Sequence, residues 1–164
     1  MPQTQVPARR VLLVDDEVAI LLTLKAILEI NGFAVDTAAN AREAKHKIKL
    51  NEYAMVITDM RMESDASGLA VVKAAKAARY APAVAVLTAF PEGDVDYYGD
   101  GADELLVKPM NVQLLVNQME AMLVAHEDKK RKPMAMAAAA AIKAQLQPKV
   151  KKPARKIATK LARA

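Results

Sequence analysis

Short apolar runs alternate with longer amphipathic segments over the first 125 residues of the chain. Each apolar run has the length of a strand, and the runs lie at 11–14, 33–37, 54–58, 83–87 and 104–107. In the segments between them, apolar residues recur every three or four positions, which is the period of a helix with one buried face. These segments predict helices at 17–30, 40–50, 68–79 and 110–125. Such alternation is typical of a parallel sheet that is covered by helices on both faces.

One repeat of this pattern is weak. The segment 89–103, between the fourth and fifth apolar runs, contains five Asp and Glu residues and few large apolar ones. A helix there would have little apolar surface to bury. We therefore expect a short or irregular fourth helix of at most two turns.

The charges divide the chain into an acidic body and a basic tail. Residues 1–125 contain 12 Lys and Arg against 17 Asp and Glu, whereas residues 126–164 contain 12 against 2. The tail is rich in Ala, Lys and Pro and has no core-forming pattern. We expect a flexible N-terminus at 1–9, one folded domain at 10–125, and a tail that is disordered or partly helical. Pro133 is expected to interrupt any helix that enters the tail.

The residue types and segments that the sequence lacks limit the cellular compartments in which the protein is expected. The chain contains no Cys, which excludes disulfides, thiolate metal sites and Cys nucleophiles and agrees with a reducing cytoplasm. No apolar run approaches the roughly 20 residues that a membrane helix needs. The first ten residues lack the apolar core of a secretory signal. We expect a cytoplasmic protein without a membrane span.

Polar residues follow four of the five predicted strands directly. Asp15 and Asp16 follow the first, Asp59 the third, Thr88 the fourth and Lys108 the fifth. The carboxyl ends of parallel strands share one edge of a sheet, so these side chains should converge. Clustered carboxylates repel one another unless a cation compensates them, and oxygen ligands without His or Cys suit Mg²⁺. The pattern indicates Mg²⁺-assisted phosphoryl chemistry in which a carboxylate is the nucleophile.

Each of these residues has a simpler explanation when it is taken alone. An acidic run after a strand commonly caps the next helix, a Thr at a strand end reflects strand propensity, and Lys-Pro is common in turns. The occurrence of all of them, in order, at the ends of the right strands favours a functional site.

Four segments of the chain resemble the receiver domains of two-component response regulators. They are VLLVDDE at 11–17, VITDMRM at 56–62, AVLTAF at 85–90 and GADELLVKP at 101–109. The resemblance covers about residues 10–125. It implies a flavodoxin-like fold of three α/β/α layers with a five-stranded parallel sheet of order 2-1-3-4-5.

The resemblance also implies the roles of the acidic residues. Asp59 corresponds to the phosphoacceptor of the family. Asp15 and Asp16 correspond to its acidic pair, and with Asp59 and the backbone carbonyl of Arg61 they would bind Mg²⁺ or Mn²⁺. The phosphoryl group would come from a sensor histidine kinase or a histidine phosphotransfer protein. The family acts by changing the binding of an output partner, and the resemblance leaves a homodimer open.

Further positions follow from the same resemblance. Thr88 and Lys108 would contact the phosphoryl group, and the small Ala89 would leave access to the phosphoacceptor. Pro109 would follow a cis peptide bond, which proline makes accessible. Leu105 stands where the family has an aromatic switch residue, so the usual output face of fourth helix, fifth strand and fifth helix is in question.

The chain departs from the family pattern elsewhere too. Four residues after the phosphoacceptor the family usually has Pro, whereas this chain has Glu63. The stretch from Thr88 to Lys108 is about two residues shorter than usual, which fits the weak fourth helix. Arg61 and Phe90 correspond to variable positions that tune the lifetime of the phosphoryl group.

Two other functions stay open alongside the phosphoaccepting receiver. One is a nucleic-acid-binding regulator, in which the basic stretch 129–163 makes non-specific contact with phosphates. The other is a Mg²⁺-dependent phosphatase with an aspartyl phosphate intermediate, but Arg61 stands where that class has a second Asp. A flavin site is disfavoured because no phosphate-binding loop follows the first strand. The tail could equally be a solubilising or docking extension, a membrane-surface helix, or a segment that folds back on the body. We expect a receiver that is not a turnover enzyme on an external substrate and has no conventional DNA-binding output domain.

Overall fold

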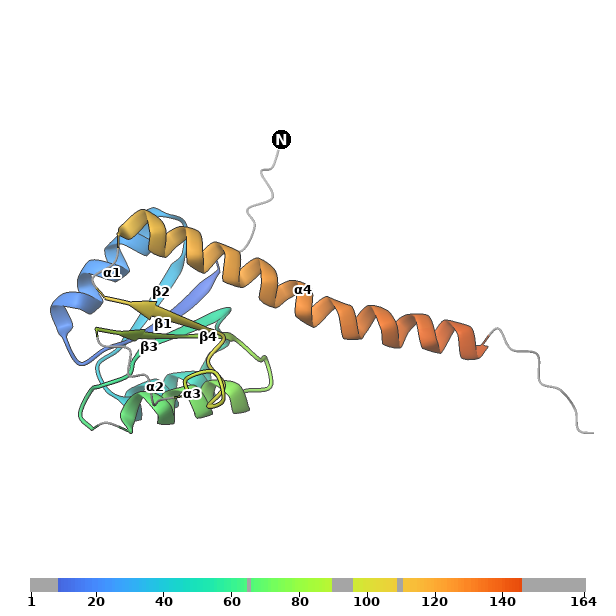
Figure 1. The fold of residues 1–164 in the computed structure, drawn as a ribbon, viewed down its shortest axis with the longest axis horizontal. Helices are drawn as coiled ribbons and strands as arrows, with labels where there is room; N and C mark the ends of the chain where they lie inside the picture. Colours follow the sequence, from blue (N-terminus) through green and yellow to red (C-terminus); the bar gives the residue numbers. More distant parts are fainter. Residues whose placement is uncertain (1–8, 65, 90–95, 109–110, 146–164) are drawn as a thin grey trace, which may run out of the picture. The chain divides into compact units, whose positions relative to one another are not determined.

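The structure is a computed structural model that describes residues 9–64, 66–89, 96–108 and 111–145. Strands and helices alternate along most of the chain (Figure 1). The strands are β1 (Arg10–Val14), β2 (Ala34–Ala38), β3 (Met55–Asp59), β4 (Ala83–Thr88) and β5 (Glu104–Val107). The helices are α1 (Val18–Ile30), α2 (Ala41–Leu50), α3 (Ser67–Ala77) and α4 (Val112–Gln145).

The five strands form one parallel sheet of order β2-β1-β3-β4-β5. The central strands β3 and β4 are buried along their whole length, as expected of strands that are covered on both faces. The predicted fold class and strand order are confirmed.

Helices cover both faces of the sheet, α1 and α4 one face and α2 and α3 the other (Figure 1). The buried side chains form one core on each face. On one face, Leu28 of α1 and Met119 of α4 pack over the sheet. On the other face, Ile48 of α2 and Val71 of α3 pack over it. The layers therefore follow the amphipathic pattern of the helices, and they leave the carboxyl edge of the sheet to loops.

The connection from β4 to β5 contains turns but no helix within its described residues 96–103. Tyr97 and Ala102 are buried against the core on the α2–α3 face. Asp103 fixes the end of the connection, because its carboxylate accepts hydrogen bonds of 2.8 Å from Val84 N and from Lys76 Nζ. Residues 90–95, which belong to the segment where a short or irregular fourth helix is expected, lie outside the described residues.

Helix α4 continues far beyond the expected end near residue 125, and the expectation that Pro133 interrupts it is wrong. A proline inside a helix removes one backbone hydrogen bond and costs about 3 kcal/mol. The residues after it, 134–141, are Met and Ala, which favour helix and offset part of this cost. The chain divides into two compact units, Met1–Asp128 and Lys129–Ala164. The predicted state of the tail as a whole stays a prediction.

Among the described residues, no helix has the length and apolar character that crossing a membrane requires.

Candidate functional site

The parallel register brings the polar strand ends to one edge of the sheet. Asp59 is the last residue of β3 and lies opposite Leu87 of β4, and the next residue, Thr88, ends β4. Asp15 directly follows β1, and Lys108 directly follows β5. Lys108 N donates a 2.7 Å hydrogen bond to Thr88 O, which fixes the backbone at the start of the last loop.

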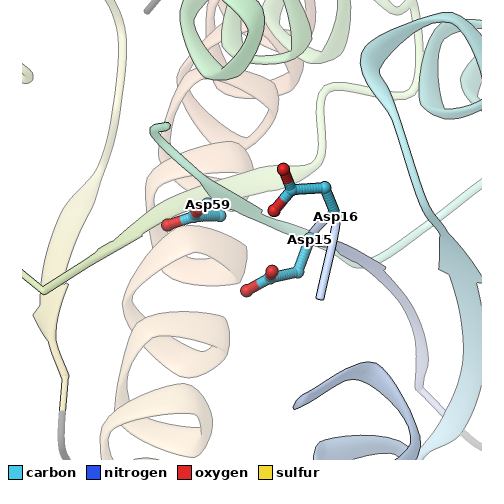
Figure 2. A group of neighbouring side chains, drawn as sticks. All are labelled: Asp15, Asp16 and Asp59. Atoms are coloured by element: carbon cyan, nitrogen blue, oxygen red, sulfur yellow. The ribbon is translucent and has the colours of Figure 1, made fainter. Parts of the chain in front are cut away.

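Three carboxylates gather at this edge (Figure 2). Asp15, Asp16 and Asp59 each offer one oxygen, and these oxygens all lie within 4.8 Å of one another. Asp15 and Asp59 are buried, whereas Asp16 is exposed. The group therefore has two fixed members in the protein and one on the solvent side.

Local hydrogen bonds hold the first carboxylate in place. Glu17 N donates to Asp15 Oδ1 at 2.9 Å, and Asp15 N donates to Ala38 O at 3.2 Å. These bonds fix the backbone of Asp15 beside β2 and hold one oxygen of its carboxylate in the turn after β1.

Lys108 supplies the positive charge of the site. Its Nζ lies 2.7 Å from Asp15 Oδ2 and 3.5 Å from Asp59 Oδ1, which is a close ion pair and a contact at the outer limit of hydrogen bonding. Burial alone would lower the pKa of Lys108, but the hydrogen bond and charge of Asp15, with those of Asp59, outweigh it and raise the pKa. The ammonium group is therefore charged at neutral pH.

Asp59 is in a less favourable electrostatic position. Burial raises the pKa of its carboxyl group, and the charge of Asp15 adds to this effect. Lys108 and the backbone N–H of Met60 act in the opposite direction but do not cancel it. One ammonium group thus compensates the buried carboxylates only in part, so the site favours a further cation.

The donor atoms fit a hard divalent cation. All three side chains of the group offer carboxylate oxygens, which Mg²⁺ and Mn²⁺ prefer over the nitrogen and sulfur ligands that suit zinc. Mg²⁺ keeps several waters and is commonly held by one or two carboxylates, so the exposed position of Asp16 is compatible with it.

The other predicted site residues differ in burial, and two of them lie outside the described residues. Thr88 is buried, Ala89 is exposed and Arg61 is exposed in the loop after β3. Leu105 is half-buried against the core on the α2–α3 face. Pro109 and Phe90 lie outside the described residues, so their predicted roles stay predictions.

Two contacts next to the site have no signal in the pattern of the sequence. Glu63 Oε1 accepts a 3.0 Å hydrogen bond from Ala41 N, which ties the loop after β3 to the first residue of α2. Gly68 lies against the end of β3, where an added Cβ would come within 2.5 Å of Asp59 O. Sequence reasoning singled out Glu63 only as a departure from a resembling family and did not assign Gly68 a role.

A comparison with protein families matches residues 11–120 to the response regulator receiver domain. Among curated proteins, the alginate biosynthesis transcriptional regulatory protein AlgB of Pseudomonas aeruginosa is 34% identical over 143 residues, covering 80% of this chain and 32% of AlgB. The transcriptional regulatory protein CpxR homolog of Haemophilus influenzae is 37% identical over 118 residues, covering 70% of this chain and 50% of that protein. The chain thus spans about a third to a half of the length of these relatives.

Solved structures agree with this match. A CheY-like response regulator receiver domain protein from Methanospirillum hungatei has a TM-score of 0.69 and 28% identity, over 74% of this chain and 98% of the other. The response regulator protein TrrA of Thermotoga maritima, in complex with Mg²⁺-BeF, has a TM-score of 0.63 and 33% identity, over 70% of this chain and 98% of the other.

Proposed function

The chain belongs to the family of response regulator receiver domains of two-component systems, and on that premise we propose that Asp59 accepts a phosphoryl group. One observation carries the proposal. Lys108 Nζ contacts both Asp15 and Asp59 at the carboxyl edge of the sheet, with Asp16 beside them. A buried acidic group with one compensating cation is arranged for the binding of phosphate and metal rather than for stability.

The proposed reaction moves a phosphoryl group from a phosphohistidine to a carboxylate. One Oδ of Asp59 attacks the phosphorus atom, an O–P bond forms, and the N–P bond of the phosphohistidine breaks. The imidazole leaves with the bonding electron pair and takes up a proton from solvent. The donor is a sensor histidine kinase or a histidine phosphotransfer protein.

Lys108 and Thr88 would act on the incoming group. The ammonium group of Lys108, 3.5 Å from Asp59 Oδ1, is close enough to shift toward a phosphoryl oxygen attached there. Its pair with Asp15 at 2.7 Å holds the lysine at the strand ends meanwhile. Thr88 ends the neighbouring strand, where its hydroxyl could donate to another phosphoryl oxygen.

Asp15, Asp16 and Asp59, with the backbone carbonyl of Arg61, would hold a Mg²⁺ or Mn²⁺ ion. When bound, this ion supplies positive charge to the oxygens of the transferring group. The Mg²⁺-BeF complex of TrrA, which is 33% identical, supports the proposal.

Phosphorylation would change the binding of an output partner, and the chain would not turn over an external substrate. Arg61, two residues after Asp59, supports this, because an aspartyl-phosphate phosphatase would use a second acid there for proton transfer.

The test is phosphorylation of the full chain by acetyl phosphate with Mg²⁺, followed by intact mass measurement. The wild-type protein should gain one phosphoryl group, and Asp59→Asn should gain none. Asp128→Asn, which changes an exposed acid far from the strand ends in sequence, is the matched control and should behave like the wild type. Incorporation by Asp59→Asn would sink the assignment, and incorporation that is unchanged by EDTA would count against the metal ligands.

One observation favours a second candidate function in nucleic-acid binding. Residues 129–132 are four consecutive Lys and Arg on α4, and all of them are exposed. Such a cluster can neutralise phosphates with strongly salt-dependent affinity. The full chain should shift a short DNA duplex at low salt and release it as salt rises. Retention that is independent of salt would contradict this function.

A further inference from the structure

The positive charges of the acidic body are concentrated on α2, on α3 and on the short turn after it. Residues 41–50 and 67–80 contain seven Lys and Arg and one Glu. The remaining residues up to 125 contain five Lys and Arg against 16 Asp and Glu. One side of an acidic domain is therefore strongly basic, and this asymmetry is independent of the basic tail.

A groove of about 990 Å³ lies between these two helices. Its lining does not include Asp15, Asp59 or Lys108, so it is separate from the strand-end site. The apolar part of the lining consists of Ile48, Ala74, Ala77, Ala78 and Tyr80. The cationic part consists of Arg42, Lys45, Lys49 and Arg79, with His46 beside them, and the lining also contains Asn40 and one acid, Glu43.

Small side chains on α3 make the groove open. Ala74 and Ala77 leave space next to the longer side chains of α2. Tyr80, in the turn after α3, lines the groove, and its hydroxyl donates a 3.1 Å hydrogen bond to Ile48 O of α2. The groove thus lies along α2 and α3 and has a lining that is partly apolar and partly cationic.

The cations of the groove lack ion-pair partners within the described part of the chain. Two lysines outside the lining differ. Lys76 pairs with Asp103 at 2.8 Å, and Lys47 pairs at 2.8 Å with Glu43, so the acid of the lining is already compensated. Like charges three or four residues apart on a helix repel each other and destabilise it. An acidic ligand in the groove would remove this repulsion.

We propose that the α2–α3 groove is a docking site for an acidic amphipathic helix of a partner protein. Arg42, Lys45 and Lys49 are three and four residues apart, so they form one row about 10 Å long on α2. A partner helix with acidic residues at the same spacing would match this row, while its apolar ridge would fill the alanine-lined part of the groove. The site does not depend on phosphorylation of Asp59.

The residues of the groove favour an acidic helix over two other ligands. A nucleic acid would use the cations but has no apolar ridge for Ile48 and the alanines, so it matches the groove only in part. The chain's own residues 126–164 carry ten net positive charges and would be repelled.

The experiment titrates the full chain with a peptide of roughly 18 residues, long enough to form a helix when bound. The peptide has Leu on one face and Glu at i, i+3 and i+7 beside it, and the control peptide has Lys in place of each Glu. Binding is followed by amide NMR spectra. Saturable shifts of residues in 40–50 and 74–80 with the acidic peptide alone are expected.

Paired variants then test the groove against net charge. Lys45→Glu with Lys49→Glu should weaken the acidic peptide about tenfold or more, because two attractive charge pairs become repulsive. Lys73→Glu with Lys143→Glu makes the same change in charge at exposed lysines outside the lining and should change affinity less than about twofold. Ala77→Met, which fills the groove from an exposed helix position, should also weaken binding.

Other results would overturn the proposal. One is no saturable binding at about 1 mM peptide. Others are an equal loss in the control pair, or shifts confined to residues 129–145. A single-stranded oligonucleotide that binds more tightly than the peptide, with the same dependence on Lys45 and Lys49, would identify a polyanion site instead. Concentration-dependent self-association that Lys45→Glu with Lys49→Glu abolishes would identify a second copy of the chain as the occupant.

Discussion

Asp59 carries a charge where the interior of the protein opposes it. Burial and the nearby Asp15 raise the pKa of its carboxyl group, and Lys108 compensates this only in part. Residues that prepare a site for chemistry commonly reduce the stability of the fold in this way. The same electrostatics therefore predict both an activity and a loss of stability.

Asp59→Asn should increase the free energy of unfolding at pH 7, without divalent metal, by roughly 0.5–2 kcal/mol. The raised pKa sets the pH dependence, because the folded protein holds this proton over a wider pH range than the unfolded chain. The gain should be absent below about pH 4, where both states are protonated, and should grow as pH rises to the raised pKa. Urea unfolding across pH measures it, with Asp16→Asn at the exposed acid as control. A variant less stable than the wild type at pH 7 would refute this account.

Glu63→Ala should lower the free energy of unfolding by about 0.5–1.5 kcal/mol, because Ala41 N loses its acceptor and α2 loses a negative charge at its N-terminus. Glu63→Gln keeps a hydrogen-bond acceptor, so its free energy of unfolding should fall less. Faster hydrogen exchange of the Ala41 amide would locate the effect at the start of α2. Glu120→Ala, at an exposed position of α4, is the control. Unchanged exchange at Ala41 in both Glu63 variants would show that this contact does not stabilise the helix.

The helices and strands that bury apolar residues at a regular spacing could be predicted from the sequence, and those that do not could not. The five strands and the first three helices follow apolar patterns that packing enforces, and Asp15, Asp59 and Lys108 meet because parallel strands end at one edge. The end of α4 could not be predicted. Its residues 129–144 are exposed, so this part of the helix has no buried apolar face and no apolar period in the sequence. The contact of Glu63 with Ala41 could not be predicted either, because it joins the loop after β3 to the start of α2, and only the fold brings these two segments together.

Helix α3 begins so close to β3 that its first turn leaves no space for a side chain at Gly68. An alanine Cβ there would lie 2.5 Å from Asp59 O and 2.6 Å from Met60 Cα. Ala normally gains up to about 1 kcal/mol over Gly inside a helix. The clash is with backbone and should outweigh that gain, so Gly68→Ala should destabilise the fold by roughly 1–3 kcal/mol and slow phosphorylation of Asp59. Thermal unfolding and acetyl phosphate labelling measure both effects, and a stabilised variant would show that α3 can shift freely.

At the scale of the whole molecule, every residue of the two described cores lies at or before Leu123. The last contacts of the first compact unit include His126 Nε2 with Ala81 O at 2.8 Å and Glu127 with Arg9 at 3.5 Å. The charge is divided differently, since all 12 Lys and Arg of residues 126–164 lie at or beyond Lys129. The residues that stabilise the fold therefore lie before Lys129, and the residues that make the net charge of the chain positive lie at or beyond it.

Deleting residues 129–164 should separate these two properties. The net charge changes from +5 to −7, because the deletion removes 12 Lys and Arg and no acid. The free energy of unfolding should stay within about 0.5 kcal/mol of the full chain, since residues 129–144 are exposed. Phosphorylation should proceed at the same rate, and DNA retardation at low salt should disappear.

A second deletion, of residues 146–164 alone, removes seven of the 12 cations and keeps the cluster at 129–132. Partial DNA retardation by this variant would assign binding to both segments. Full retardation by the shorter chain ending at Asp128 would contradict a role of the tail, because that chain is acidic and any binding would have to come from the basic face of α2 and α3.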